Sequence, residues 1–403
     1  MFSAIKTRLL ALSTACFLLL FGCNASKSRP SVHDAEGAGS WIVGKDFIVE
    51  EAEGWTALFK RNTGWFGGDG IFAIPLDGQE YGSSSQATNL VIFSDTMIGE
   101  IEGDSLKPGF SMVNNSLAYL QGDYPKADNI YFQWAKDPQG RPQSLFVPHT
   151  PSAENKDYYW LGDGFINPDL DSTLYIFAYR MRNSDNGEEW SFREMGTDLI
   201  ALSLNDSMPF VAQRQIETPL RFEDGGFGAG IYVNTRQAGA PDPDGYVYVF
   251  GVRGMEKHLM VARVLPKHFE NFEAWRFWNG KNWSRKMEDV SFVTQGVSNE
   301  LSLSPLPDGR YALVFTLDGL SPVVAMRVAD SPFGPFGEVI ELYEAKEMQQ
   351  KNYITYNAKA HPSLSKEGEL LISYNVNSFS FFEELHDNPQ LYRPRFIRIK
   401  FIR

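Results

Sequence analysis

The chain has 403 residues and a formal net charge of −13, with 50 acidic against 37 basic side chains. Because a surface this acidic repels phosphate backbones, nucleic acid is not an expected partner. Six scattered histidines argue against a multi-histidine metal centre, and the sequence has no phosphate loop, dinucleotide fingerprint or Gly-x-Ser-x-Gly elbow.

The chain opens with two basic residues and an apolar run from Leu9 to Phe21, which ends just before Cys23. This run is too short for an ordinary membrane span. It resembles a bacterial lipobox, in which the peptide is cut before the cysteine and the sulfur takes a diacylglyceryl group. We therefore predict a signal peptide over residues 1–22 and a lipidated, palmitate-bearing tether over 23–40. A plain secretory signal cleaved further along is the alternative.

The rest of the chain, residues 41–403, is predicted to form a single domain. It is longer than the ~250–300 residues at which one hydrophobic core usually stops growing, which would normally favour two domains. However, no proline- and serine-rich linker, charge block or change of composition divides it. A repeat architecture escapes the size limit because each unit packs only on its neighbours.

Five times along this domain, a short stretch of small residues with a polar side chain precedes an apolar run typical of a β-strand. The small-residue stretches are Gly67–Phe72, Leu161–Ile166, Gly228–Val233, Ser298–Leu303 and Ala358–Leu364. The apolar runs are Leu90–Phe93, Leu174–Phe177, Tyr246–Phe250, Tyr311–Phe315 and Leu370–Tyr374. Repetition of a sheet-type unit of this size predicts blades around an axis, so we expect an all-β, five-bladed β-propeller.

Glycine-containing turn pairs punctuate these units. Asp77-Gly78, Asp244-Gly245, Asp308-Gly309 and Glu367-Gly368 each precede an apolar run and predict hairpin turns. With the motif strand innermost in each blade, the polar residues at its start would all point into one pocket at the axis.

Four acids are candidates for chemistry at that pocket. A glycosidic bond is broken by two carboxyl groups, one protonated and one ionised. Asp69 and Asp163 lie in Gly-Asp-Gly segments behind aromatic residues, where desolvation would raise a carboxyl pKa. Asp95 ends the apolar strand of the unit that contains Asp69, and Glu300 begins the fourth inner strand. The leading catalytic pair is Asp69 with Asp95, and Asp163 and Glu300 are further acids.

Each acid also has a structural interpretation. An aspartate before glycine is above all a turn residue, which applies to Asp69 and Asp163 taken singly. Asp95 could cap the turn that follows it. For Glu300 a functional role is favoured, because burying an unpaired carboxylate would cost free energy of folding.

Six further residues are predicted to bind substrate through stacking or hydrogen bonds: Trp65, Trp160, Asn114, Asn115, Asn299 and His361. The two neighbouring asparagines could equally form a turn. His361 could hold a sugar hydroxyl, tune a carboxylate or bind a cation, or it could be hydrogen-bonded in place. No cofactor is required by this chemistry, and a structural Ca2+ near the propeller axis stays open. The aromatic residues between Trp275 and Trp283 could extend a carbohydrate cleft or form a blade-edge cluster.

Several longer motifs resemble a known family. They are Gly68-Asp69-Gly70 leading to Phe93-Ser94-Asp95-Thr96, Tyr246–Arg253 with Leu259–Val264, Ser331–Phe336, and Tyr356–Pro362 with Ile372–Asn377. Together they resemble the domain-of-unknown-function family numbered 4185, part of which is classed as glycoside hydrolase family 183 and acts on D-arabinan. The resemblance implies an architecture like that of glycoside hydrolase families 43 and 32. It also implies that Asp69 and Asp95 carry catalysis.

The sequence thus predicts a lipid-anchored glycosidase of the bacterial cell envelope, on its periplasmic or outer-surface face. Its substrate would be a polysaccharide or glycan, with arabinan-like furanosidic linkages implied by the resemblance. We expect a monomer that meets the membrane only through its lipid. The alternative function is a non-catalytic carbohydrate-binding or surface-scaffold propeller.

Overall fold

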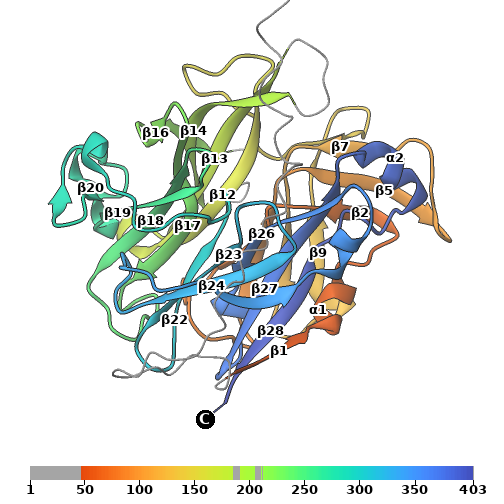
Figure 1. The fold of residues 1–403 in the computed structure, drawn as a ribbon. Coiled ribbons are helices and arrows are strands. Elements are labelled where there is room, and N and C mark those ends of the chain that lie inside the picture. The colour runs from red at the N-terminus through yellow and green to blue at the C-terminus, as the bar shows by residue number, and fades with distance from the viewer. Residues whose placement is uncertain (1–46, 185–190, 205–209, 211, 403) are drawn as a thin grey trace, which may run out of the picture. The chain divides into compact units, whose positions relative to one another are not determined.

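The structure, a computed structural model, describes residues 47–184, 191–204, 210 and 212–402. The predicted signal peptide, the tether with Cys23, and the first residues of the predicted domain lie outside these ranges. The described part is an all-β protein whose strands pair antiparallel (Figure 1). No helix in these ranges is both long and apolar enough to cross a membrane.

The described chain has six sheets of four or more strands, and five of them follow one another along the chain. The first has β3 (Phe72–Pro75), β4 (Thr88–Phe93), β8 (Ser116–Gln121) and β9 (Ile130–Gln133). The second has β12 (Tyr158–Asn167), β13 (Thr173–Asn183), β14 (Phe192–Ser203) and β15 (Arg214–Glu217). The third has β16 (Arg221–Phe222), β17 (Gly225–Asn234), β18 (Tyr246–Arg253), β19 (His258–Val264), β20 (Arg276–Trp278) and β21 (Trp283–Ser284).

The fourth sheet has β22 (Ser302–Pro305), β23 (Tyr311–Thr316), β24 (Val323–Ala329) and β25 (Ile340–Glu344). The fifth has β26 (Tyr353–Ala360), β27 (Glu369–Ser378), β28 (Arg395–Phe401) and β1 (Phe47–Glu51). In this last sheet the first described strand pairs with the last one, with Phe47 opposite Phe401 (Figure 1). Strands from the two ends of the described chain therefore complete one sheet.

Smaller elements extend the first and fifth sheets. A separate ladder has β2 (Thr63–Gly68), β5 (Thr96–Glu102), β6 (Ser105–Leu106) and β7 (Ser111–Val113), and a two-stranded ladder has β10 (Ala135–Lys136) and β11 (Pro142–Gln143). The α-helices are α1 (Glu53–Leu58) and α2 (Phe381–Asp387), and seven short 3-10 turns complete the described elements.

In each sheet the apolar run found in the sequence forms the strand that follows the motif strand, and both faces of these strands are buried. In β4, Leu90 and Ile92 face the second sheet, whereas Val91 and Phe93 face the fifth. Successive side chains of a strand point to opposite faces, so a strand packed on both sides needs an uninterrupted apolar run. This explains why these segments were the clearest signal in the sequence.

The apolar core consists of five clusters, and each cluster lies between two sheets. They join the first sheet to the second, the second to the third, the third to the fourth, the fourth to the fifth, and the fifth to the first. The motif strands also contact one another in the same order, β3 with β12, β12 with β17, β17 with β22, and β22 with β26. The sheets therefore form a closed cycle of neighbours.

The motif strands are irregular at corresponding positions along their length. Pairing shifts between Leu161 and Gly164 in β12, between Phe227 and Gly230 in β17, and between Tyr356 and Lys359 in β26. In the first sheet the chain breaks between β2 and β3, and in the fourth the irregular stretch directly precedes β22. Bulges re-aim side chains, so these positions can direct polar groups inward.

Two details of the predicted strands were wrong. Asp163 does not precede its strand but lies within β12, at the bulge. The glycines of the four turn pairs do adopt a positive φ, as predicted. However, only Asp308-Gly309 lies in a short connection, between β22 and β23. The other three lie in longer loops between their strands.

Candidate active site

Asp69 and Asp95 lie side by side at two interruptions of adjacent strands. Asp69 occupies the break between β2 and β3, and Asp95 the break between β4 and β5. The backbone N–H of Asp69 donates to the Asp95 carbonyl at 3.2 Å, and the N–H of Ser94 donates to the Asp69 carbonyl at 2.9 Å. Two acids separated by 26 positions thus belong to one hydrogen-bonded backbone unit.

The Asp69 carboxylate is held by hydroxyl groups from the fifth sheet and the loop after α2. The Tyr356 hydroxyl donates to Oδ2 of Asp69 at 2.7 Å, and the Asn377 amide donates to that hydroxyl at 3.4 Å. Burial raises the pKa of Asp69, while hydrogen bonds from Tyr356 and Tyr392 and the charge of Lys359 act to lower it. The surroundings of Asp69 therefore offset much of the cost of its negative charge.

Asp95 has weaker support for its charge. The Asn114 amide donates to Oδ1 of Asp95 at 3.1 Å. Burial and then the charge of Asp69 raise the pKa of Asp95 to about 7, against the lowering effect of Asn114 and Trp160. In a coupled pair of acids, the first proton leaves the better-stabilised carboxyl group. The pair thus loses its first proton from Asp69, and Asp95 keeps its proton until the pH approaches about 7.

An aromatic wall adjoins Asp95. The indole nitrogen of Trp160 has no hydrogen bond within the usual limits among the described residues, yet it is close enough to affect Asp95. Its ring packs edge-on against Phe192, with ring centroids 4.7 Å apart, and against Tyr158 at 6.0 Å. Trp160 is half-buried and Phe192 is exposed, so this wall is accessible from one side.

Glu300 forms a buried ion pair with Lys359. Their charged atoms lie 2.6 Å apart, and the Asn357 amide donates to the other oxygen of Glu300 at 2.8 Å. Burial raises the pKa of Glu300, Lys359 lowers it, and the charge of Asp69 raises it further. The last effect means that Glu300 lies within electrostatic range of the Asp69–Asp95 pair.

Asp163 is tied to the backbone. Its two oxygens accept the N–H groups of Gly164 at 2.8 Å and of Ile231, in the neighbouring β17, at 2.7 Å. Burial nevertheless raises the pKa of Asp163 to about 7, against these bonds and the charge of Lys359. Its side chain lines a cavity with Glu80 and His361. Asp163 thus joins the motif strands of the second and third sheets.

The four predicted acids are therefore brought close together, from the first, second and fourth sheets. The charge of Lys359 acts on Asp69, Asp163 and Glu300 alike, and Asp69 acts on Asp95. The side chains are not dispersed over separate outer faces. Of the polar predictions, Asn114 reaches Asp95, while the exposed Asn299 accepts a bond from Lys257 at 2.9 Å.

Two residues predicted to bind substrate, Trp65 and Asn115, do not face the site. Trp65 is only 1 % exposed and stacks on Phe132 with centroids 4.5 Å apart, because its position on β2 turns the indole into the core. Asn115 is fully buried and bonds the backbone of Phe146 and Tyr159.

His361 is likewise buried, and its Nε2 lies 2.7 Å from the Ser373 hydroxyl. Burial and then the charge of Lys359 lower its pKa to about 3, so it is neutral. Within the described ranges, no group of three or more His, Cys, Asp or Glu side chains is arranged to hold a metal ion.

The tryptophan-rich segment forms an aromatic cluster at the edge of the third sheet. Trp275 and Phe277 are buried, and Trp278 and Trp283 pack against Phe333 with ring centroids 4.6 and 5.3 Å apart. These rings are occupied by one another and by the chain, which leaves the cluster interpretation rather than the cleft.

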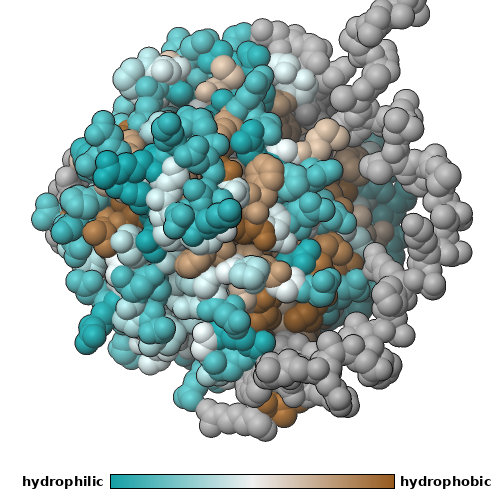
Figure 2. Space-filling view, turned by 60° about the vertical axis from the view of Figure 1, so that its left-hand side comes forward, coloured by the Kyte–Doolittle hydropathy of each residue, from teal (hydrophilic) through white to brown (hydrophobic). Residues whose placement is uncertain are grey.

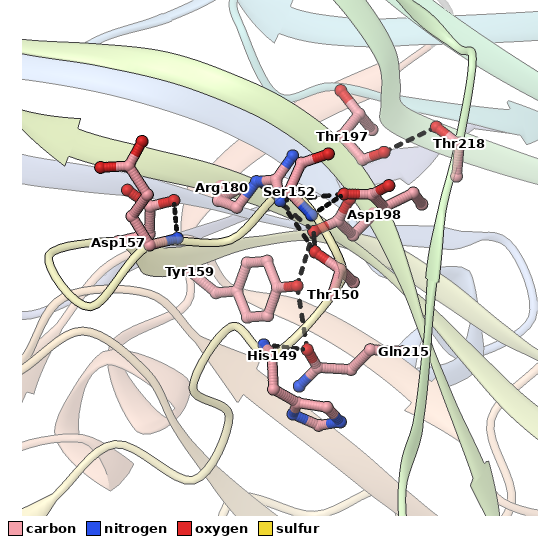
Figure 3. Close-up of polar contacts among 12 residues, drawn as sticks. His149, Thr150, Ser152, Asp157, Tyr159, Arg180, Thr197, Asp198, Gln215 and Thr218 are labelled. Carbon is pink, nitrogen blue, oxygen red and sulfur yellow. Dashed lines mark hydrogen bonds and ion pairs between the residues drawn. The ribbon is translucent and has the colours of Figure 1, made fainter.

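A second polar cluster lies across the strands of the second sheet and the loop that precedes it (Figure 3). Arg180 donates to the Thr150 hydroxyl at 2.8 Å, and the Tyr159 hydroxyl donates to Asp198 at 2.6 Å. Gln215 accepts from the backbone of His149 and holds the loop that precedes β12. Every acid in this cluster has a cation or a hydroxyl partner, so we assign it to the anchoring of that loop.

The sequence analysis missed two residues that contact the acids. Tyr356 and Tyr392 come from β26 and from the loop after α2. Tyr356 begins one of the motifs that resemble a known family, but a tyrosine in a strand is usually interpreted as a core residue. Tyr392 lies in a loop with no periodic pattern, so no signal in the sequence marked it.

Comparisons with known proteins give a family and a fold. A family model described as a domain of unknown function, DUF5005, matches residues 52–401. It differs from the family that the motifs resemble. No curated protein is similar enough in sequence to count as a match.

A provisionally named hydrolase from Bacteroides ovatus has a similar crystal structure, at 20 % identity and a TM-score of 0.69, covering 88 % of this chain and 90 % of that one. An α-L-arabinofuranosidase from Podospora anserina gives 12 % identity, a TM-score of 0.42 and coverage of 85 % and 98 %. An endo-arabinase from Bacteroides thetaiotaomicron is 11 % identical with a TM-score of 0.40. The match covers 82 % of this chain and 97 % of that one. The first of these similarities supports the all-β fold.

Proposed function

The chain belongs to the DUF5005 family, and we propose that it is a glycoside hydrolase in which Asp69 and Asp95 act as the two catalytic carboxyl groups. The observation that carries the proposal is the pairing of these acids on one backbone unit, with different support for their charges. Pairs of carboxyl groups whose surroundings separate their protonation states mark the acid and the base of a hydrolase.

In the proposed reaction, protonated Asp95 donates its proton to the glycosidic oxygen as that bond breaks. Ionised Asp69 either takes a proton from the attacking water or attacks the sugar carbon itself. Both routes add the elements of water across the bond. The acid limb of the pH profile of kcat/KM would then report protonation of Asp69, and the alkaline limb would report loss of the Asp95 proton.

The other acids have supporting roles in this proposal. Glu300 is neutralised by Lys359, and both oxygens of Asp163 accept backbone bonds, so neither is as free to exchange a proton as Asp69. Trp160 and Phe192 form an aromatic wall on which a sugar ring can pack, and Asn114 fixes Asp95. Carbohydrate substrates with arabinan-like furanosidic linkages are proposed from the motif resemblance.

The architecture proposed for residues 41–403 is one five-bladed β-propeller. Support comes from the closed cycle of five sheets and five core clusters. The strand β1 would close the ring by pairing with β28. A shared centre explains how acids from the first, second and fourth sheets come within range of one lysine.

Anchoring in the bacterial envelope through acylated Cys23 also stays a proposal, based on the lipobox-like sequence. We further propose a monomer. Figure 2 shows one face with mostly hydrophilic side chains and separate apolar patches, which is typical of a surface without an obligate partner.

The test is release of reducing ends from a panel of arabinans, with xylan for comparison. We expect Asp69→Asn and Asp95→Asn each to lower kcat/KM by ~10²–10⁴-fold. Asp104→Asn, at an exposed turn between β5 and β6, is the matched control and should leave the rate unchanged.

The alternative, a propeller that binds glycan without cutting it, predicts a different result. No glycan would be cleaved by the wild-type protein, and binding would be equal in wild type and both variants. That outcome would reject the hydrolase.

A further inference from the structure

Lys359 is an unusual feature of the site. Its side chain is wholly buried, and beyond its ion pair with Glu300 its amino group makes no hydrogen bond within the usual limits in the described part of the chain. The amino group instead lies 4.5 Å from the centroid of the Phe72 ring. A cation with so few partners is costly to bury, so its presence calls for an explanation beyond local packing.

The bulge in β26 explains how the lysine reaches this position. Asn357 adopts a φ of 54°, in the left-handed region, and the pairing shifts between Tyr356 and Lys359. In a regular strand, alternate side chains face opposite sides. Here Tyr356 contacts Asp69, while Asn357 and Lys359 both contact Glu300. The bulge therefore turns three polar side chains of one strand toward the acids.

From this position Lys359 acts on titratable groups of several elements. They are Asp69 between β2 and β3, Asp163 in β12, Glu300 before β22, and His361 at the end of its own strand. Asp69 also faces Asp95, Tyr356 and Tyr392. The lysine is thus the shared counter-charge of a cluster in which all the carboxyl groups could not be ionised together.

We propose that Lys359 is a positioning residue that decides which carboxyl group of the site is ionised. With the cation in place, Asp69 keeps its negative charge although Glu300 is charged nearby, and Asp95 keeps the proton. Glu300 serves as the partner that holds the amino group in the cluster. This inference rests on the proposed hydrolase function, in which Asp69 is the base and Asp95 the acid.

The first test is Lys359→Met, which keeps an unbranched side chain, one atom shorter, and removes the charge. We expect the acid limb of the kcat/KM profile to move upward by about one pH unit or more, since Asp69 then loses its proton without a nearby cation. Lys257→Met is the matched control, because Lys257 bonds Asn299 outside the acid cluster. It should leave the limb in place.

A second variant keeps the test decisive if Lys359→Met does not fold. Glu300→Gln removes the anion and leaves the lysine free to act on Asp69, so the acid limb should move downward, the opposite direction. The double variant Lys359→Met/Glu300→Gln removes both charges and should return the limb to within roughly half a unit of the wild-type position.

A purely structural lysine predicts something else. The folded Lys359→Met protein, checked by circular dichroism, would then have a lower kcat at every pH with an unmoved acid limb, and the inference would be wrong although the hydrolase stands. If wild-type protein cleaves no glycan, the titration of the Asp69 carboxyl group is followed directly by carbon-13 NMR, with Asp69→Asn for assignment. An unchanged midpoint in Lys359→Met would again overturn the inference.

Discussion

The first and second sheets contain the same Gly-Asp-Gly segment in different surroundings. Asp69 receives a tyrosine hydroxyl from the fifth sheet and faces Asp95. Asp163 receives two backbone N–H groups, one of them from the adjacent strand β17. The first aspartate is supported by side chains that leave it free to exchange a proton, whereas the second is bonded into the sheet. The same local sequence thus has a role that its neighbours determine.

The largest expected effect separates the two aspartates by activity. Asp69→Asn should lower kcat/KM on a cleaved glycan by ~10²–10⁴-fold, because the base is lost. Asp163→Asn should stay within about 10-fold of wild type, since its role is to join two strands. Initial rates of reducing-end release at the wild-type pH optimum measure both. An equal loss in the two variants would show that Asp163 belongs to the catalytic group.

The second prediction separates them by stability. In Asp163→Asn, the new amide would offer one acceptor oxygen to two buried N–H donors, so this variant should lower the free energy of unfolding by about 1–3 kcal/mol at pH 5. Denaturant unfolding measures this value. Asp69→Asn should be no less stable than wild type, because it removes a buried charge without orphaning a backbone donor.

The pH dependence of this loss has a definite sign. The pKa of Asp163 is about 7 in the folded protein and about 3.9 in an unfolded chain. When the pKa of a carboxyl group is higher in the folded than in the unfolded protein, its protonated form stabilises the fold. This stabilisation is complete below the unfolded pKa and is lost as the pH rises through the folded pKa. Asparagine does not titrate, so the difference between Asp163→Asn and wild type should shrink from pH 5 to pH 8. A difference that grows over this range would mean that the ionised carboxylate is the stabilising form.

The sequence contained enough to predict the sheets, and the reason is visible in β23. Its apolar run alternates between two core clusters, with Leu313 on one side and Val314 on the other, so each residue had to be apolar. The convergence of Asp69, Asp95, Asp163 and Glu300 followed from the same repetition. Such patterns are local and periodic, which is why they can be read without a structure.

What could not be predicted depends on bulges and on distant partners. The repeat predicts that Lys359 and Glu300 point into one pocket, but their ion pair depends on a bulge in β26 that the sequence does not show. Trp65 was assigned to the pocket from its neighbours in sequence, but packing turned it into the core. The contact between Tyr356 and Asp69 joins residues 287 positions apart. No rule of spacing links two such positions.

A smaller effect tests the support of Asp69. Tyr356→Phe removes the hydroxyl that donates to Oδ2 and should raise the acid limb of the kcat/KM profile by about one pH unit, because the charged form of Asp69 loses a hydrogen bond. Tyr374→Phe is the control. Tyr374 lies in the same sheet as Tyr356, but its hydroxyl donates to Glu347 at 3.1 Å. Equal profiles for both variants would assign the support of Asp69 to Tyr392 and Lys359 alone.

The smallest effect concerns Asp95 and its partner. Asn114 lowers the pKa of Asp95 through its amide, so Asn114→Ala should let Asp95 hold its proton to higher pH. The alkaline limb of kcat/KM should move upward by roughly half a unit, while the acid limb stays in place. The pH profile of kcat/KM on the preferred glycan measures both limbs in one experiment.

The neighbouring Asn115→Ala is the contrasting variant. Asn115 bonds the buried backbone of Phe146 and Tyr159, so its loss should lower the free energy of unfolding and leave the alkaline limb unmoved. The two adjacent asparagines would then differ as the two aspartates do. Asn114 would influence proton transfer, whereas Asn115 would stabilise the fold. If Asn114→Ala shifts neither limb, the proton donor of the reaction is a group other than Asp95.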